Sequence, residues 1–258
     1  MIQWTAFLRK EWMEFIRSGK LWMILVLCIL FGITNPAIAK LTPWMLENFS
    51  GSFQELGITL GQVKVNAMTS WSQFDKNYSL FLILFLLLMS NILTAEYQKG
   101  TLVPIVTRGM KKWKILMIKL IMVLMIWIIG YWLCVLITFG YNAYFWGNQI
   151  LSHLFSYWGC LFLVGLWMIF VLILASAYFS SYLSVCLFCA AEFAISYCLG
   201  MIGTIQKYVP TYLLKSSGLL TGETALSDYV WAIGVVIILL MIHMITALLV
   251  FHHKNLCT

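Results

Sequence analysis

The sequence predicts an all-α integral membrane protein, in which six transmembrane helices follow an amphipathic helix at the amino-terminal end. Of the 258 residues, 62% are hydrophobic and 10% are charged, whereas soluble domains carry about 25% charged residues. Apolar runs extend for about the 20 residues that a helix needs to cross a bilayer. Segments such as residues 80–89 lack the apolar–polar alternation of a membrane β-barrel strand. Helices therefore explain these runs better than a barrel does.

The first 20 residues have the pattern of a helix that lies in the membrane interface. Apolar residues such as Trp4 and Phe7 are interspersed at helical spacing with charged residues such as Arg9 and Arg17. A helix with one apolar face and one basic face binds at the bilayer surface. We therefore expect residues 1–20 to run along the cytoplasmic surface before the first span, with a merely solvated leader as the alternative.

Six apolar segments are the predicted transmembrane helices, and together with the leader they form a single domain that covers residues 1–258. They occupy residues 21–39, 78–95, 115–140, 154–175, 182–203 and 229–252. Residues 41–77 are expected to form a long polar loop, and residues 204–228 a second long connection. The first span ends in small residues like those of a signal-peptide cleavage site. Because the preceding charged region is long and holds two glutamates, we expect this segment to be a retained span.

The distribution of basic residues predicts the orientation of the spans, because Lys and Arg are retained on the cytoplasmic side. With a cytoplasmic amino terminus, most of the 16 Lys and Arg residues fall in cytoplasmic segments, and carboxylates offset the others in the outer connections. This topology explains the net charge of +7 without any binding to nucleic acid. We expect both termini to be cytoplasmic and the protein to be a multi-pass protein of the bacterial cytoplasmic membrane.

The connection between the second and third spans carries the most information about function. Glu96 stands where the second span ends, and Gly100 and Thr101 follow as a pair that can end one helix and begin another. The basic residues that lead back into the membrane are Arg108, Lys111, Lys112 and Lys119. This pattern predicts a short surface helix that docks a partner. The same lysines also suit anionic lipid, at about 1 kcal/mol each.

With these features the chain resembles the ABC type-2 permeases, the six-helix membrane subunits of bacterial ATP-binding-cassette exporters. The resemblance covers the whole chain and consists of the amphipathic leader, the Glu96-x-x-x-Gly100-Thr101 pattern, the basic return into the third span and the long last outer connection. It implies that residues 96–108 form a coupling helix in a cleft of an ATPase subunit. It also implies that two permease copies, identical or paralogous, work with two ATPase subunits that bind ATP and Mg²⁺.

The sequence contains no phosphate-binding loop of the form G-x-x-x-x-G-K-[ST]. We therefore expect no enzyme activity and no cofactor in this chain itself, and ATP hydrolysis in a partner. An intramembrane enzyme is less favoured, because Glu192 and His243 each stand alone in their spans. A non-transporting sensor or immunity subunit, which would bind a ligand through residues 41–77, stays open.

One carboxylate, Glu192, lies near the middle of the fifth predicted span. If ionised at the bilayer centre it would cost about 2.5–3.5 kcal/mol, so it should face protein or water rather than lipid. Ser184 and Ser196 lie at multiples of four residues from Glu192 and share its helix face. This polar face either lines a translocation path or allows close helix packing, and the sequence leaves both interpretations open.

The cysteines and histidines predict neither a redox centre nor a metal site. Most of the seven cysteines lie inside apolar segments, where cysteine behaves as a small hydrophobic residue. A metal site needs ligands that converge in space, and the group formed by His252, His253 and Cys257 matches this need only weakly.

The composition of the spans bears on the cargo. They are rich in Phe, Trp, Leu and Met and nearly free of fixed charge, which suits a hydrophobic or amphipathic cargo better than a sugar or an ion. In the family that the chain resembles, one branch exports antimicrobial or toxic peptides, often for self-protection. Other branches move lipids, drugs or lipid-linked glycans. We expect a hydrophobic or amphipathic peptide, with those other cargoes as alternatives.

Overall fold

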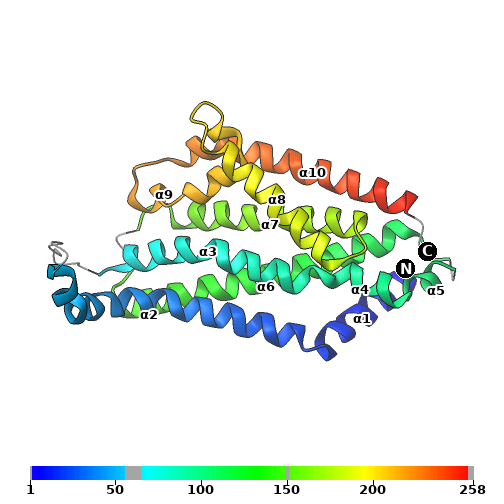
Figure 1. Cartoon of the computed structure of the whole chain (residues 1–258), viewed down its shortest axis with the longest axis horizontal. Coiled ribbons are helices and arrows are strands. Elements are labelled where there is room, and N and C mark those ends of the chain that lie inside the picture. The colour runs from blue at the N-terminus through cyan, green and yellow to red at the C-terminus, as the bar shows by residue number, and fades with distance from the viewer. Residues whose placement is uncertain (1, 56–64, 108, 149–150, 255–258) are drawn as a thin grey trace.

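The computed structural model of the chain describes residues 2–55, 65–107, 109–148 and 151–254, and all regular elements in these ranges are helices. The α-helices are α1 (Ile2–Arg17), α2 (Lys20–Glu55), α3 (Ala67–Met89), α4 (Asn91–Lys99), α5 (Leu102–Thr107), α6 (Lys112–Phe145), α7 (Leu154–Tyr178), α8 (Tyr182–Leu199), α9 (Gly218–Thr221) and α10 (Val230–His253). The 3-10 helices are η1 (Gln206–Tyr208), η2 (Pro210–Lys215) and η3 (Leu226–Tyr229). The long helices lie side by side, and α10 ends at the same end of the bundle that carries α1 and α5 (Figure 1).

Six helical segments of the described chain are long and apolar enough to cross a membrane, which confirms the predicted number of spans. They are Lys20–Met45, Ala67–Lys99, Lys112–Phe145, Leu154–Tyr178, Tyr182–Leu199 and Leu226–His253. The chain is therefore a multi-pass helical membrane protein. Among these spans α7 is the most deeply buried, whereas α8 and α10 are the most exposed. The cytoplasmic placement of the termini stays a prediction.

An aromatic core joins α3, α6 and α7. Trp127 of α6 is fully buried, stacks on Tyr131 at 5.5 Å between ring centroids and meets Phe85 of α3 edge-on at 5.0 Å. Its ring lies directly over Gly165 of α7, where an added Cβ would come within 1.9 Å of the ring. Small residues allow close approach between transmembrane helices, and here a glycine makes room for the largest side chain.

The polar loop predicted for residues 41–77 is wrong for most of that range. α2 continues to Glu55 through Pro36 and Pro43, while residues 56–64 lie outside the described part of the chain. A proline removes one backbone donor and crowds the preceding turn, but membrane helices tolerate it where neighbouring groups satisfy the freed carbonyls. The polar residues after the first span thus extend its helix.

The second span also begins earlier than predicted, at Ala67 rather than at residue 78. Polar residues in its first turns find partners on other helices, which allows them to be helical and half-buried. Asn77 donates a hydrogen bond to Asn35 of α2 at 2.8 Å, and the Tyr157 hydroxyl of α7 donates to Asp75 at 2.5 Å. A single sequence does not show such partners, so polar residues at these positions predict a loop.

Residues 204–228 form the second long connection, as predicted, and fold into η1, η2, α9 and the start of η3. The Thr211 hydroxyl of η2 donates to the carbonyl of Ser196 at 2.9 Å, and the Tyr229 hydroxyl donates to the carbonyl of Lys215 at 2.9 Å. These bonds fasten the connection to the ends of α8 and α10. The helix of the fifth span ends at Leu199, before the predicted end at residue 203.

The amphipathic leader is the helix α1, which packs against α2 and α6. Its buried residues Phe7, Glu11 and Phe15 recur every four positions and form one face, and Arg9 and Arg17 are exposed. Gly19 then turns the chain into α2 with the left-handed φ of +76° that favours glycine. The position of α1 at a bilayer surface stays a prediction.

Candidate functional site

The segment after the second span folds as a capped helix end followed by a short helix. Gly100 ends α4 in the left-handed conformation, with φ 63° and ψ 15°. Its N–H donates to the carbonyl of Tyr97, and the N–H of Thr101 donates to the carbonyl of Glu96, both at 3.2 Å. This pair of bonds is the Schellman arrangement that closes helices at glycine. The short helix expected from the sequence follows directly as α5, and Thr101 is exposed in the turn.

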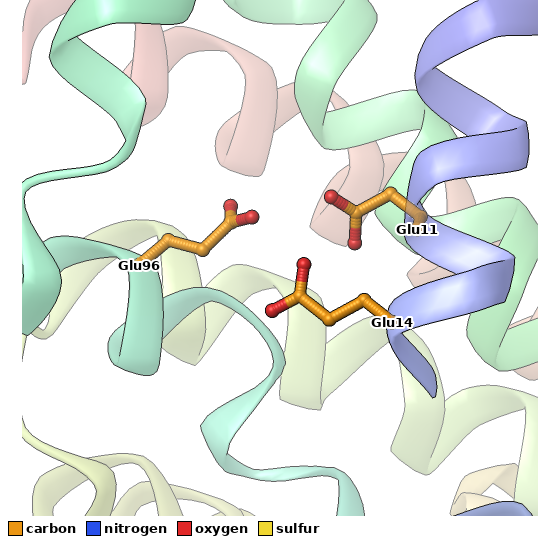
Figure 2. Close-up of side chains that lie close together, drawn as sticks. All are labelled: Glu11, Glu14 and Glu96. Carbon is orange, nitrogen blue, oxygen red and sulfur yellow. The ribbon is translucent and has the colours of Figure 1, made fainter. Parts of the chain in front are cut away.

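A buried charge cluster lies where α1, α4 and α6 meet. Its members are Lys10, Glu11 and Glu14 of α1, Glu96 of α4 and Lys119 of α6. Lys119 pairs with Glu11 and lies 3.0 Å from Oε1 of Glu96. Nζ of Lys10 lies 2.8 Å from Glu14, 3.0 Å from Glu11 and 3.2 Å from Glu96. The three carboxylates thus converge from α1 and α4 (Figure 2).

The centre of this cluster is shielded from solvent. The side chains of Lys119, Glu96 and Glu11 are only 3%, 5% and 7% exposed, and Oε2 of Glu96 has no hydrogen-bond partner among the described residues. With all five groups ionised, the cluster carries one negative charge in excess. Because buried charges are retained when they are paired, these ion pairs hold α1 against the adjoining ends of the second and third spans.

Two members of the cluster, Lys10 and Glu14, lie at its rim on α1. Burial alone would lower the pKa of Lys10, but hydrogen bonds to Glu14 and Glu11 outweigh burial and raise the pKa above its usual 10.5. The hydrogen bond from Lys10 lowers the pKa of Glu14 below 4.5. Because the pKa of Glu14 is lower in the folded protein than in the unfolded chain, its stabilisation is complete above about pH 4.5. It is lost as the pH falls through the folded pKa.

The spacing of the three carboxylates also suggests a metal site. Their nearest oxygens all lie within 4.8 Å of one another, and Mg²⁺ and Ca²⁺ prefer oxygen ligands. The ammonium groups of Lys10 and Lys119, however, already lie between these oxygens and each contacts at least two carboxylates. A cation in the same place would meet their positive charge, so the arrangement is that of an ion-pair network.

The other basic residues predicted in this segment do not join the cluster. Lys111 is exposed at the start of α6. Nζ of Lys112 donates to the carbonyls of His252 at 3.0 Å and Lys254 at 2.7 Å, which ties the start of α6 to the end of α10. Arg108 lies outside the described residues.

A pair of ionisable residues, Glu192 of α8 and His243 of α10, lies within the spans and apart from this cluster. Oε1 of Glu192 is 3.9 Å from Nε2 of His243, whose side chain is 9% exposed, against 33% for Glu192. In the described part of the chain, Nδ1 of His243 has no hydrogen-bond partner. The sequence predicts that each of these residues stands alone in its span. That prediction is wrong, because the two side chains lie opposite each other.

The two serines predicted on the same face have different surroundings. Ser196 is buried and donates a hydrogen bond to the Thr211 hydroxyl at 3.3 Å, so it holds η2 against α8. Ser184 is half-buried in the first turn of α8. Ser196 thus serves helix packing, one of the two interpretations that the sequence left open.

An apolar cavity of about 410 Å³ lies between α3, α7 and α8. Its lining is mostly apolar and includes Leu86, Leu172, Leu187, Ala190 and Phe193, with Ser79 as a polar residue. The cavity lies within membrane-spanning segments, and it suits a flexible apolar group.

Sequence reasoning missed Lys10 and Glu11 as partners of Glu96 and Lys119. One signal for Glu11 was present, because it lies between Phe7 and Phe15 at four-residue spacing and therefore shares their apolar face. A carboxylate on the apolar face of a helix must find a buried partner. The identity of that partner depends on tertiary packing.

Comparisons of the chain with protein-family models, with curated proteins and with solved structures find no match. The fold and the six spans define the class, a multi-pass helical membrane protein. A more specific function is therefore inferred from the charge cluster, the α5 turn and the apolar cavity.

Proposed function

We propose that this chain is the permease subunit of an ATP-binding-cassette exporter, with α5 as the helix that receives motion from the ATPase. The observation that carries the proposal is the attachment of α5. It stands at the end of the bundle between the second and third spans, and the buried ion pairs of Glu96 and Lys119 join those spans to α1.

The proposed mechanism follows from these attachments. α4 precedes α5 and continues from α3 with a break at Ser90, whereas α6 follows α5 and runs through the membrane. A displacement of α5 would therefore act on two spans, and the charge cluster would pass it to α1 and from there to α2. Such a displacement is a rigid-body transition, in which ATP binding and hydrolysis take place in the partner.

The proposed assembly contains two permease copies, identical or paralogous, and two ATPase subunits that bind ATP and Mg²⁺. It lies in the bacterial cytoplasmic membrane, with the α1 and α5 end on the cytoplasmic side. In this chain the role is mechanical, and the chemistry of hydrolysis belongs to the ATPase.

A charge placed on α5 tests the docking role. Thr107 is exposed on α5, and its hydroxyl donates to the carbonyl of Pro104 at 3.1 Å. Thr107→Asp should reduce the ATPase that co-purifies with the tagged protein from native membranes about tenfold or more, because an unpaired charge buried in the contact costs at least about 1.4 kcal/mol.

Thr221→Asp is the matched control. Thr221 is also exposed, lies outside the α5 region, and donates to the carbonyl three residues earlier, that of Gly218, at the same distance of 3.1 Å. Its substitution should leave the co-purified ATPase unchanged. Equal ATPase recovery with both variants, or no ATPase with the unmodified protein, would refute the coupling role of α5.

For the cargo we propose a hydrophobic or amphipathic peptide, and the apolar cavity between α3, α7 and α8 supports this choice. Its lining has no ion pair or hydrogen-bonding cluster that would bind a sugar. Burial of apolar ligand surface, in contrast, stabilises binding by about 25 cal/mol per Å². A lipid tail presents similar chemistry, and a peptide is distinguished from it by its polar backbone and termini.

Filling the cavity tests whether it receives cargo. Ala190→Trp should reduce the binding of a fluorescent amphipathic peptide by the protein in nanodiscs roughly tenfold. The added indole would keep about two methylene groups of the peptide out of the cavity, and the loss of their burial costs about 1.6 kcal/mol. Ala194→Trp is the control, since Ala194 is exposed one turn further along α8 and does not line the cavity. Equal loss of binding in both variants would show that the cavity is not the binding site of the peptide.

A further inference from the structure

We propose that Glu192 and His243 form a proton-binding site in the middle of the membrane. This inference goes beyond the proposed exporter function, which needs no proton. It rests on the 3.9 Å approach of Oε1 to Nε2, on the burial of His243 and on the position of both residues within their spans.

The depth of the pair follows from the helix geometry. Glu192 lies about ten residues from the start of α8 at Tyr182, and His243 lies about ten residues from the end of α10 at His253. These two helix ends face the same side, because the connection after α8 reverses the chain direction once, and Nζ of Lys254 at the end of α10 donates to the carbonyls of Ala177 and Tyr178, just before α8. At 1.5 Å per residue, each group is about 15 Å from its helix end, which is half of a hydrocarbon core of about 30 Å.

The charge of the pair favours one bound proton. With no proton the pair carries one negative charge, with one proton it is neutral, and with two it carries one positive charge. Charge at the bilayer centre is costly and intramembrane ionisable groups pair with one another. The neutral state with a single proton is therefore the most stable, either as carboxylate with imidazolium or as carboxylic acid with imidazole.

Other titratable groups near the pair are few. On α8 they are the thiols of Cys186 and Cys189. The middle of α7, residues 161–175, contains no ionisable side chain, and neither does α10 between Val230 and Ile242. Near the middle of these three spans, Glu192 and His243 are thus the groups that change charge.

The two residues differ in access, which sets the path of the proton. Glu192 is one-third exposed and His243 is nine-tenths buried, so the carboxylate is the outer group of the pair and takes up a proton first. Transfer then breaks the O–H bond of Glu192 and forms an N–H bond at Nε2 of His243, leaving carboxylate and imidazolium. The 3.9 Å separation exceeds a hydrogen bond, so the transfer needs a small side-chain rotation or one bridging water.

Proton binding would also affect the contact between α8 and α10. When the proton leaves, the carboxylate of Glu192 loses the partner that neutralises it, and the pair regains its unfavourable charge. The protonated pair therefore favours the close approach of α8 to α10, and the deprotonated pair favours the entry of water between them. The site would link proton occupancy to the position of the two most exposed spans.

The test measures the protonation of His243 directly in the full-length protein in nanodiscs. The protein contains four histidines, so ring-labelled histidine gives few NMR signals, and His243→Gln assigns the relevant one. In the unmodified protein this signal should titrate between about pH 5 and 8. Glu192→Gln should weaken proton binding about tenfold or more, because the opposite charge that stabilises the imidazolium is lost.

Controls separate a proton site from a structural contact. Glu192→Gln keeps the size and polarity of the side chain, so a merely structural clamp would leave the His243 titration unchanged. Glu223→Gln, which removes an exposed carboxylate outside the six spans, should also leave it unchanged. In His243→Gln, infrared spectroscopy should detect a new protonated carboxyl group, because Glu192 without its partner takes up a proton.

Two results would overturn the proposal. One is a His243 titration that is identical in the unmodified protein and in Glu192→Gln. The other is a His243 that stays neutral throughout this pH range while Glu192 is ionised. If Glu192→Gln does not fold, the titration of the unmodified protein and the infrared spectrum of His243→Gln decide the question. Neither measurement requires the ATPase, so their outcome is independent of the proposed export function.

Discussion

Lys119→Met should destabilise the protein by about 3–5 kcal/mol, which is the cost of removing one partner from a buried ion pair. Methionine has a similar length and preserves the packing of α6, but it leaves the carboxylates of Glu11 and Glu96 buried without their shared ammonium group. The residual ion pair with Lys10 is at the more exposed rim. Denaturant unfolding of the protein in detergent, followed by tryptophan fluorescence, measures the change.

Two further variants show whether the charge explains this loss. Lys99→Met removes an exposed lysine near the same cluster and should change stability by less than about 1 kcal/mol. Adding Glu96→Gln to Lys119→Met removes one of the stranded charges and should restore part of the stability. If Lys119→Met and Lys99→Met had equal effects, the cluster would not hold α1 to the spans.

Gly165→Ala should destabilise the protein by about 3 kcal/mol or more, which is at the upper end of overpacking effects. The added methyl group would lie 1.9 Å from the ring of Trp127, and that ring is fully buried against Phe85 and Tyr131. The ring therefore has no free space to move into, and α6 and α7 must separate. Thermal unfolding in detergent should show a lower melting temperature.

Gly159→Ala is the matched control on the same helix. A Cβ at Gly159 meets no atom within 4 Å, so this substitution should be neutral or should stabilise α7 by up to about 1 kcal/mol through better helix propensity. Adding Trp127→Leu to Gly165→Ala removes the steric clash but leaves a cavity, because leucine is smaller than tryptophan. The double variant should therefore recover only part of the stability that Gly165→Ala loses. A Gly165→Ala protein as stable as Gly159→Ala would show that the aromatic core does not require close contact at this position.

Much of the fold could be predicted because membrane spans depend on local composition. An apolar run of sufficient length must be helical in lipid, where backbone groups need internal partners, and all six spans meet this condition. The loop prediction for residues 41–77 was wrong because polar residues and Pro43 do not by themselves end a helix. Asn77 and Asp75 find their partners on α2 and α7, and such pairings depend on the arrangement of helices.

The candidate sites could be predicted in part for the same reason. Glu96, Gly100 and Lys119 stood out because they lie at a span boundary, but the pairing of Glu96 and Lys119 with α1 depends on tertiary packing. His243 was missed as the partner of Glu192 although both lie equally deep in their spans. Depth narrows the possible partners, while the rotation of each helix decides which side chains meet, and a single sequence does not specify that rotation.

The length of α2 has a consequence for locating the protein in its membrane. Its 36 residues correspond to about 54 Å of helix, and its apolar span ends at Met45, so its last turns lie beyond the hydrocarbon. They lie on the side opposite α1 and α5 (Figure 1). A protease added to sealed cells or to inverted vesicles will therefore meet this protruding helix in only one of the two preparations, and that digestion reports the sidedness of the protein.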